Sequence, residues 1–370
     1  MAVTCDEVMA LLDGIAPFKL AQDWDNAGLL IGRGDASVQN ILVAMDLTPG
    51  VVEEAIQRSC EMIITHHPIL FRGTNRITDA DGEQKMILRL IEKGIALCAC
   101  HTNFDSAQSG TSDMLARLLG VTDPQPLIAH VEKAYKVVTF VPMEHAPAVR
   151  RAATAAGAGK QGFYEGCMFA AQGIGMFTPQ EGAAPYIGQK GRFESVPEER
   201  METFADIHTL PGVIKAVLQA HPYEEPVIDV YPLQREQKQG LGRVGMLKKP
   251  CTLDALCDRL SQYVKGQKSV VGEGSRMVSA IAVQCGAGGV SDMQIAKRLK
   301  ADVLISADIK HHDRLYAAQI GMSLINCLHH ESEYPGLLSL IAGLQEAANQ
   351  VQYNVRVFES MVPQAVRYIE

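Results

Sequence analysis

Short apolar runs alternate with longer amphipathic stretches in two parts of the chain, residues 40–130 and 252–358. Such alternation predicts βα units, in which each strand is followed by a helix. Ahead of the first part, Thr4 and Glu7 form the capping-box pattern that starts a helix. The pattern predicts strands at 41–45, 62–64, 95–100, 280–284, 302–306, 323–327 and 354–358, and helices at 51–58 and 83–92. The sequence therefore predicts two α/β blocks.

Between the two blocks, residues 131–235 contain longer loops rich in glycine and proline. The pattern there predicts a βαββαβ order, which is the order of a ferredoxin-like fold. The expected strands are 136–141, 168–171, 202–206 and 227–231, and the expected helices are 145–156 and 211–220. A polar, glycine-containing linker at 234–242 is expected to lead back to the second block. We therefore expect one α/β body from residues 1–130 and 236–370, interrupted by a ferredoxin-like α+β insert at 131–235.

The chain carries 34 basic and 42 acidic residues, a formal net charge of -8 without long runs of one sign. This balance gives no strong signal for nucleic-acid binding. No uncharged apolar stretch reaches about 18 residues, the length that a membrane-spanning helix needs, and no export signal is visible. The nine cysteines form no Cys-x-x-Cys pair, which is typical of core cysteines in a reducing compartment. We therefore expect a cytoplasmic protein without a membrane segment.

The histidines are unevenly distributed. Six of the eleven occur as adjacent pairs: His66 with His67, His311 with His312, and His329 with His330. The first and third pairs follow predicted strands, and ligand crevices of open α/β sheets lie at such strand ends. Because neighbouring side chains on a strand point to opposite faces, a pair at a strand tip could address two metal ions. For any single pair, an exposed polar turn is the alternative interpretation.

Carboxylates accompany these histidines. The predicted strand at 95–100 ends just before His101 and Asp105, of which Asp105 is the better ligand candidate because a carboxylate balances metal charge. Its alternative role is to cap the following helix. His329 and Glu333 are four residues apart and would share one face of a helix. Glu333 could then bridge two ions.

Imidazole and carboxylate donors suit two divalent metal ions and leave the choice among Zn, Mn, Fe, Co and Ni open. The missing thiolates argue against a closed structural zinc site. Open coordination positions would admit water, and ion pairs about 3.5–4 Å apart are typical of hydrolytic sites. Since the donors come from both blocks, we expect one metal-binding α/β body whose metal binding survives deletion of the insert.

Several separated motifs, in order along nearly the whole chain, resemble those of the Nif-three-like dinuclear-metal proteins, also called GTP cyclohydrolase I type 2 homologues. The motifs are Asp23-Trp24-Asp25-Asn26 with Gly28 and Gly32, His66-His67-Pro68, His101-Thr102-Asn103-Phe104-Asp105, Asp308-Ile309-Lys310 with His312-Asp313, and His329 with Glu333. The resemblance implies that His67 and Asp105 bind one metal, His66 and His329 the other, and Glu333 both. It also implies a ring-shaped homohexamer built from two trimers, and the insert is similar to CutA-like and PII-like proteins.

One motif departs from the family pattern, because His311 stands where relatives commonly carry an aromatic residue. We therefore expect the 311–312 pair to line the site at most. His312 is then a candidate proton shuttle, and Lys310 is a candidate contact to a substrate phosphate. An exposed or capping role is the alternative for this pair. We expect Trp24 to pack beside the site rather than to offer a stacking surface.

Two glycine-rich segments resemble nucleotide-binding loops. Gly240–Gly245 matches the dinucleotide fingerprint as a string but lacks the strand–turn–helix context, so we expect a linker and an edge strand. Cys285–Asp292 follows a predicted strand and opens a helix. A tight turn is favoured there, and binding of an anion by free backbone amides is the alternative.

Two functions are consistent with these residues. The first is a metal-dependent hydrolase that acts on a purine nucleotide or a related small molecule, with Glu333, His312 and Lys310 as catalytic candidates. The second is a metal-handling or regulatory scaffold that binds a protein partner without turnover, which the insert suggests. The open metal site favours the first, and the sequence does not decide between them.

Overall fold

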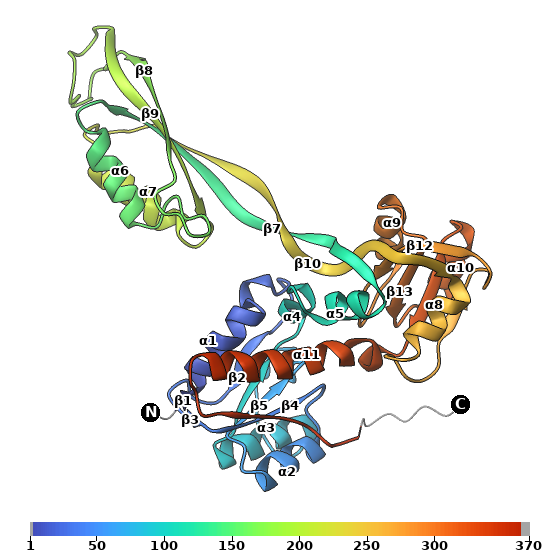
Figure 1. The fold of residues 1–370 in the computed structure, drawn as a ribbon. Helices are drawn as coiled ribbons and strands as arrows, with labels where there is room; N and C mark the ends of the chain where they lie inside the picture. Colours follow the sequence, from blue (N-terminus) through green and yellow to red (C-terminus); the bar gives the residue numbers. More distant parts are fainter. Residues whose placement is uncertain (1–2, 364–370) are drawn as a thin grey trace. The chain divides into compact units, whose positions relative to one another are not determined.

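The structure is a computed structural model that describes residues 3–363, apart from the side chains of residues 132 and 235–237. The chain divides into two compact units. We call Met1–His130 with Lys238–Glu370 the discontinuous unit, and Val131–Gln237 the insert unit. Figure 1 shows the fold and labels most of the helices and many of the strands. Each unit is described by itself below.

The first sheet of the discontinuous unit has five strands in the order β15-β4-β5-β6-β2. The first four of these run parallel to one another, and β2 pairs antiparallel with β6. The strands are β2 (Gly28–Ile31), β4 (Asn40–Ala44), β5 (Met62–Thr65), β6 (Ala96–Ala99) and β15 (Arg356–Glu359). The helices around them are α1 (Cys5–Ile15), α2 (Pro49–Gln57), α3 (Gly82–Lys93) and α11 (His329–Gln350).

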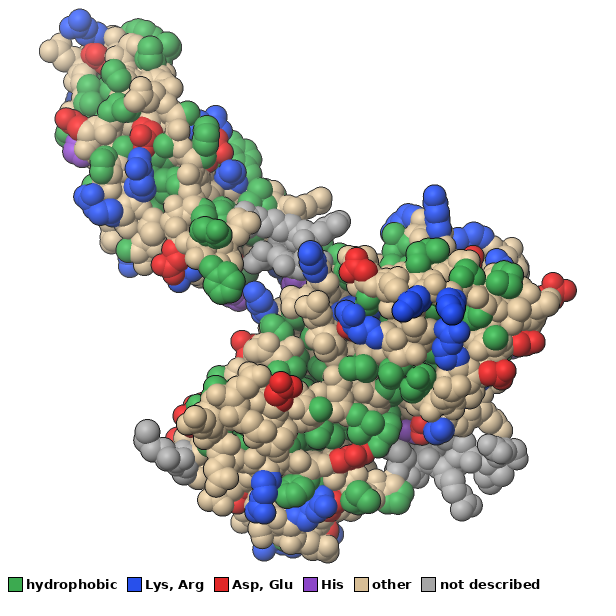
Figure 2. Space-filling model, viewed as in Figure 1, with side chains coloured by type: hydrophobic (Ala, Val, Ile, Leu, Met, Phe, Trp, Pro, Cys, Tyr) green, Lys and Arg blue, Asp and Glu red, His purple; other side chains and the backbone are tan. Residues whose placement is uncertain are grey.

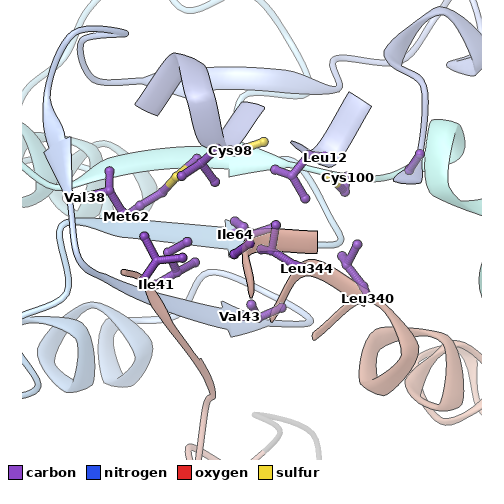
Figure 3. Packing of buried hydrophobic residues seen from close by; sticks show 14 of the residues in the cluster. Leu12, Val38, Ile41, Val43, Met62, Ile64, Cys98, Cys100, Leu340 and Leu344 are labelled. Atoms are coloured by element: carbon purple, nitrogen blue, oxygen red, sulfur yellow. The ribbon is translucent and has the colours of Figure 1, made fainter. Parts of the chain in front are cut away.

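Both faces of this sheet are buried. In β4, Ile41 and Val43 pack with residues of α1 and α11, whereas Leu42 and Ala44 pack with residues of α2 and α3. Figure 3 shows the first of these clusters, in which Leu340 and Leu344 of α11 approach the sheet. Continuous apolar runs are what a parallel sheet covered on both sides requires. The predicted strands at 41–45 and 62–64 and helices at 51–58 and 83–92 are confirmed.

The second sheet of this unit contains four strands from the C-terminal half in the order β11-β14-β13-β12, followed by β10. Its two faces carry separate apolar clusters, one with α5 and α8 and the other with α9 and α10. The strands are β11 (Ser269–Val271), β12 (Met277–Val283), β13 (Val303–Ala307) and β14 (Ser323–Cys327), and the helices are α5 (Thr111–Leu118), α8 (Leu253–Leu260), α9 (Val290–Arg298) and α10 (His311–Gln319). The predicted strands at 280–284, 302–306 and 323–327 are confirmed in this sheet. The predicted strand at 354–358 overlaps β15, which pairs with β4 in the first sheet and not with the second block.

The insert unit has the βαββαβ order that its sequence predicts. The elements are β7 (Val121–Pro142), α6 (Ala146–Ala155), β8 (Phe169–Phe177), β9 (Glu194–Asp206), α7 (Leu210–Ala220) and β10 (Ile228–Thr252). The strand order β10-β7-β9-β8 places the first and third strands of the unit in the middle of its sheet. Helices α6 and α7 supply Val149 and Val213 to one apolar cluster with Val141 and Met201 of the sheet.

The expected polar linker at 234–242 is wrong, because these residues belong to the long strand β10. Gln234 and Lys238 are both exposed, so no apolar alternation marks the strand in the sequence. Gly240 allows close approach of β7, since a Cβ there would lie 2.1 Å from the carbonyl oxygen of Ile128. A strand made mostly of polar residues is therefore indistinguishable by pattern from a loop.

The expected edge strand at Gly240–Gly245 is also wrong, because β10 lies between β12 and β7. Arg243 is only 1% exposed there and its Nε lies 2.9 Å from Asp113 Oδ1. Its guanidinium also donates to the carbonyl oxygens of Gly240 and Ala107. A buried charge is stable only with such partners, and two of them, Asp113 and Ala107, lie more than 100 residues away in the sequence.

The remaining elements are short. They are β1 (Val3–Thr4), the 3-10 turn Phe18–Leu20, β3 (Ser37–Val38) and α4 (Thr102–Ser106). The predicted capping box is confirmed, since Thr4 N donates to Glu7 Oε2 at 2.8 Å and Glu7 N donates to Thr4 Oγ1 at 3.3 Å. Within residues 3–363, no helix combines the length and apolar character needed to cross a membrane. Acidic and basic side chains are scattered over the face shown in Figure 2.

Candidate metal centre

His66 and His67 stand directly after β5, where the parallel ladder continues for two more residues. The amide of His66 donates to the carbonyl oxygen of Ala44 at 3.1 Å, and that of His67 donates to Met45 at 3.0 Å. The backbone therefore holds both residues in strand-like positions, and their imidazoles differ in exposure. The His66 side chain is 1% exposed and that of His67 is 24% exposed.

The other predicted donors lie on helices that follow strands. Asp105 belongs to the short helix α4 after β6, and Thr111 Oγ1 donates to Asp105 Oδ1 at 2.5 Å. His329 opens α11 directly after β14, and Glu333 lies one turn later. Because they are four residues apart, His329 Nε2 and Glu333 Oε1 come within 3.2 Å.

Glu333 lies among the imidazoles of both sequence blocks. Its Oε1 is 3.6 Å from His66 Nε2, and its Oε2 is 3.3 Å from His67 Nε2. His66 Nε2 also lies 3.6 Å from Asp105 Oδ1, and His67 Nε2 lies 3.2 Å from His329 Nε2. The structure thus brings together all five residues that the sequence selected as metal ligands.

The donor atoms fall into overlapping groups whose members lie within 4.8 Å of one another. One group is His66, Asp105 and Glu333, and another is His67, His329 and Glu333. The family resemblance implies a different pairing, with His67 beside Asp105 and His66 beside His329. Glu333 is common to both groups, which is the position that the sequence suggested for a bridging carboxylate.

His101 joins the site as well. It forms a third donor group with His66 and His67, and its ring centroid lies 5.3 Å from that of His66. The sequence placed His101 at the strand tip but preferred Asp105 as the ligand. His101 directly precedes α4, the helix that carries Asp105.

The Nδ1 atom of each of these four imidazoles has a hydrogen-bond partner outside the donor cluster. This arrangement leaves the Nε2 atoms to face the donor cluster and selects one tautomer of each ring, as outer partners do at metal sites. The Nδ1 contacts are His66 to Cys100 O at 2.8 Å, His67 to Asp46 at 2.8 Å, His101 to Asp25 at 2.8 Å, and His329 to Asp308 at 2.7 Å. Asp46 received no role from the sequence, and Asp25 and Asp308 appeared there only as parts of motifs.

The charges of the cluster shift its pKa values strongly. Burial lowers the pKa of His67, but the hydrogen bond to Asp46 and the Glu333 carboxylate 3.3 Å from its Nε2 more than offset burial and raise it to about 10. Burial also lowers the pKa of His329, but the contacts with Glu333 and Asp308 outweigh burial and raise it to about 9. Burial alone would raise the pKa of Glu333, yet the surrounding imidazoles hold it well below its ordinary value. Burial raises the pKa of Asp105 despite the nearby His66.

The donor atoms fit a metal ion. His66 Nε2 and Glu333 Oε2 are buried and make no hydrogen bond, although other donor atoms lie near them. Buried polar atoms without a hydrogen bond carry a cost unless an ion or water satisfies them. Imidazole nitrogens and carboxylate oxygens are ligands for divalent transition metals. These residues could therefore hold a metal ion without rearrangement of the fold.

The chain matches the family described as Duf34/NIF3 (NGG1p interacting factor 3) over residues 3–364. It belongs to the Duf34/NIF3 family. A Staphylococcus epidermidis protein named GTP cyclohydrolase 1 type 2 homolog is 36% identical over 333 residues, which cover 89% of each chain. Membership in the Duf34/NIF3 family confirms the resemblance based on the separated motifs.

Two solved structures share the fold of this Duf34/NIF3 chain. A Bacillus cereus protein related to NIF3 is 35% identical, with a TM-score of 0.73 over 100% of both chains. A Staphylococcus aureus protein is 30% identical, with a TM-score of 0.84 over 100% of this chain and 99% of that one. The α/β fold class is therefore confirmed from sequence and structure together.

Gly286 is a feature of the site that sequence reasoning missed. Its φ is +73°, and a Cβ there would lie 2.4 Å from Glu333 Oε1 and 3.5 Å from His329 Nε2. Only glycine leaves room for the Glu333 carboxylate in this conformation. The glycine run at 285–292 was visible in the sequence, but its contact with Glu333 depends on the folding of two distant segments.

The glycine segment at 285–292 leaves few backbone amides free to bind an anion. The amide of Gly286 donates to Ser332 Oγ at 3.0 Å, and that of Gly288 donates to the carbonyl oxygen of Ala307 at 3.1 Å. The amide of Gly289 donates to Asp292 Oδ2 at 2.8 Å. Because these amides already have internal acceptors, the tight-turn interpretation is favoured over an anion site.

Lys310 and His312 are not among the clustered donors. Both are exposed at the start of α10, next to Asp308, which contacts His329. Within the described residues, no hydrogen bond or ion pair joins Lys310 or His312 to the five predicted ligands. Their catalytic roles therefore stay predictions.

Trp24 lies beside the site, as expected, but its ring is more exposed than that of a packing residue. Trp24 is 58% exposed and Phe71 is 47% exposed, and their ring centroids lie 5.7 Å apart. Both rings border His101, at centroid distances of 6.0 and 6.4 Å. The Duf34/NIF3 site therefore has an exposed aromatic rim next to its imidazoles.

Proposed function

We propose that this chain is a hydrolase that depends on two divalent metal ions and acts on a purine nucleotide or a related small molecule. The observation that carries the proposal is the pair of donor groups that share Glu333. The name GTP cyclohydrolase 1 type 2 homolog, borne by relatives, supports a nucleotide as the substrate.

In this proposal, His66, Asp105 and Glu333 hold one ion, and His67, His329 and Glu333 hold the other. His101 is a further donor, grouped with His66 of the first site and His67 of the second. Bound there, two divalent ions would supply Lewis acidity and make a water molecule acidic enough to attack the substrate near neutral pH. Zn, Mn, Fe, Co and Ni all suit these ligands.

The protein's own part is to hold the donors in place. Asp46 and Asp308 fix the rings of His67 and His329 through Nδ1, so that each Nε2 keeps its direction. Thr111 orients Asp105 by donating to its carboxylate. Preorganised ligands of this kind lose little conformational freedom when an ion or a substrate binds.

The aromatic rim supports a planar substrate. Trp24 and Phe71 expose large ring surfaces beside His101, and a heterocyclic base could stack on them. Stacking on an aromatic side chain contributes about 1–3 kcal/mol per base. We assign the base of the substrate to this rim, and we keep Lys310 and His312 as candidates for a phosphate contact and for proton transfer.

The test is turnover by the metal-loaded full chain. Purine nucleotides and phosphoesters are incubated with each of the five candidate metals, and products are identified by mass spectrometry. We expect turnover that Glu333→Ala abolishes, while Glu346→Ala, an exposed position on the same helix α11, retains it. Trp24→Ala should raise KM for a base-containing substrate more than Trp24→Phe does.

The opposite outcome would support the scaffold. If tightly bound metal is present and no compound in the panel is consumed, the hydrolase proposal fails. A partner protein that is lost when residues 131–235 are deleted would then favour a metal-handling or regulatory role.

We also propose an oligomeric state and a cellular location for this chain. The family resemblance implies a homohexamer, which light scattering of the full chain would test. We also propose a cytoplasmic location, supported by the nine cysteines, none of which forms a disulfide.

A further inference from the structure

The insert unit contains a cavity of about 600 Å³. Its volume falls within the roughly 300–1,000 Å³ of typical small-molecule sites. The wall is formed by the end of β8, the loop that follows it, and parts of β7, β9 and the segment before β10: residues 174–183 and 185–187, Phe140, Glu198, Tyr223–Glu225 and Val227. None of the proposed metal ligands belongs to this wall.

Aromatic rings form much of the wall. The ring centroid of Tyr223 lies 5.9 Å from that of Phe177 and 6.5 Å from that of Tyr186. Phe140 also lines the cavity. Ring faces carry partial negative charge, so such a wall attracts cations as well as apolar groups.

A buried carboxylate lies in the same wall. Glu198 is 7% exposed, and its Oε1 accepts a hydrogen bond from the Tyr223 hydroxyl at 2.6 Å. For its Oε2, no hydrogen-bond partner is seen within the described residues. Gly175 leaves the space that this carboxylate fills, since a Cβ there would lie 2.1 Å from Oε2. The structure thus keeps one oxygen of a largely desolvated carboxylate available to the cavity.

The charge of the wall has one sign. Glu181, Glu224 and Glu225 also line the cavity, whereas no described lining residue is Lys, Arg or His. The amide of Ala184 donates to Glu224 Oε2 at 2.8 Å, which ties the loop after β8 to this side. The carboxylates of the wall would therefore repel a nucleotide or another anion.

Two histidines touch the wall from outside. His145 Nε2 lies 2.7 Å from the Tyr186 hydroxyl, and His221 lies against Tyr223 with its Nε2 on the carbonyl oxygen of Phe140. Burial lowers the pKa of His221, so this imidazole is neutral and does not balance Glu198. Arg200 also lies outside the wall, 5.8 Å from the centroid of the Phe140 ring, but its Nε pairs with Glu202 Oε1 at 2.8 Å. The negative charge of the lining carboxylates is thus left for a ligand to neutralise.

A metal ion is a poor match for this cavity. The described residues of the insert unit contain no group of three His, Cys, Asp or Glu donor atoms close enough to share an ion. An organic cation needs only one or two carboxylates and an aromatic surface.

We propose that this cavity binds a small organic cation, an amine or guanidinium joined to an apolar or aromatic group. Its positive group lies at Glu198, and its apolar part lies among Phe140, Phe177 and Tyr223. The proposal does not depend on the metal centre or on the hydrolase proposal.

The experiment compares two ligands of similar shape and opposite charge on the full-length protein. Phenethylammonium and 3-phenylpropionate are titrated by isothermal calorimetry, and calcium chloride is titrated separately. We expect saturable binding of the ammonium compound alone. Binding of the carboxylate with equal affinity, binding of calcium to the cavity, or no binding of the ammonium compound would each overturn the proposal.

Variants locate the site. Glu198→Gln keeps the size of the side chain and removes its charge, and should weaken ammonium binding about tenfold or more. Ala183→Phe should abolish binding by filling the cavity, whatever the charge. The matched control is Glu165→Gln, at an exposed carboxylate of the insert unit outside the cavity wall, which should bind as the unmodified chain does. Unchanged binding in both Glu198→Gln and Ala183→Phe would overturn the assignment.

Discussion

The two compact units each bury carboxylates, but they surround them with different neighbours. In the discontinuous unit, Glu333 lies among imidazole nitrogens, and groups of three donor atoms come within 4.8 Å of one another. In the insert unit, Glu198 lies beside Tyr223 in an aromatic wall, and the described residues there form no such group. The density of donor atoms thus separates a site that fits metal ions from one that fits an organic cation.

The difference also concerns how the donors are held. Four imidazoles in the discontinuous unit have an outer partner at Nδ1, so their positions are set before any ion arrives. In the insert unit, a single phenol holds the buried carboxylate. We therefore expect substitutions near the metal centre to act mainly on metal affinity and to leave the insert cavity unaffected.

The largest expected effect is on Glu333. Glu333→Ala removes the carboxylate shared by both donor groups, so metal affinity should fall by more than the roughly 10–100-fold typical of outer-partner substitutions. Elemental analysis after dialysis measures the loss, with Glu346→Ala on the same helix as the control. If Glu333→Ala retains as much metal as the unmodified chain, the shared position of Glu333 has no bearing on metal binding.

A smaller effect is expected for Asp46, which contacts no proposed ion. Asp46→Asn removes the charged partner of His67 Nδ1, and metal affinity should fall about 10–100-fold. Competition with a chromogenic chelator measures the affinity. Asp35→Asn, at an exposed carboxylate paired with Arg33, is the control and should have no effect. An equal loss in both variants would point to a general charge effect.

A moderate effect on the apparent metal affinity is expected from a change of pH. In the metal-free protein the pKa values of His67 and His329 are raised to about 10 and about 9, so both imidazoles hold protons near neutral pH. Metal must displace these protons, and its apparent affinity should therefore rise with pH until both values are passed. Calorimetry in buffers of different ionisation enthalpy should detect proton release on binding. Metal uptake without proton release at pH 7 would contradict this.

The same pKa shifts have a consequence for stability without metal. Because both folded-state values lie above the ordinary value near 6.5, their contribution to stability is complete below about 6.5. It is lost as pH rises through about 9 and 10. Thermal melts of chelator-treated protein between pH 6 and pH 10 should show this decline, and melts of metal-loaded protein should show less of it.

The smallest expected effect is that of the insert unit on metal binding. Deleting residues 131–237 and joining the strand ends with a short Gly-Ser turn should leave the metal content unchanged, since all proposed ligands lie in the discontinuous unit. The close approach of Gly240 to Ile128 makes such a turn feasible. A folded deletion variant that has lost its metal would show that the two units depend on each other.

The sequence predicted much of this arrangement because the informative residues follow strong apolar strands. His66 and His67 follow β5 of the first sheet and His329 follows β14 of the second. They could be located from strand tips alone, since ligand crevices lie at the carboxyl ends of such strands. Glu333 followed from helical spacing to His329. The five proposed ligands were therefore within reach of pattern and chemistry.

Other features depend on contacts between distant segments, which no local pattern reveals. Asp46 follows β4 without a motif, and Gly286 matters only because α11 brings Glu333 against it. The strand character of residues 234–242 was missed because its polar side chains give no apolar alternation. The buried position of Arg243 likewise depends on Asp113, 130 residues away.

Anomalous diffraction from crystals of the metal-loaded full chain tests the central claim most directly. The account predicts two anomalous peaks in each chain, one among His66, Asp105 and Glu333 and one among His67, His329 and Glu333, with the Glu333 carboxylate adjacent to both. A single peak, or peaks away from these side chains, would contradict it.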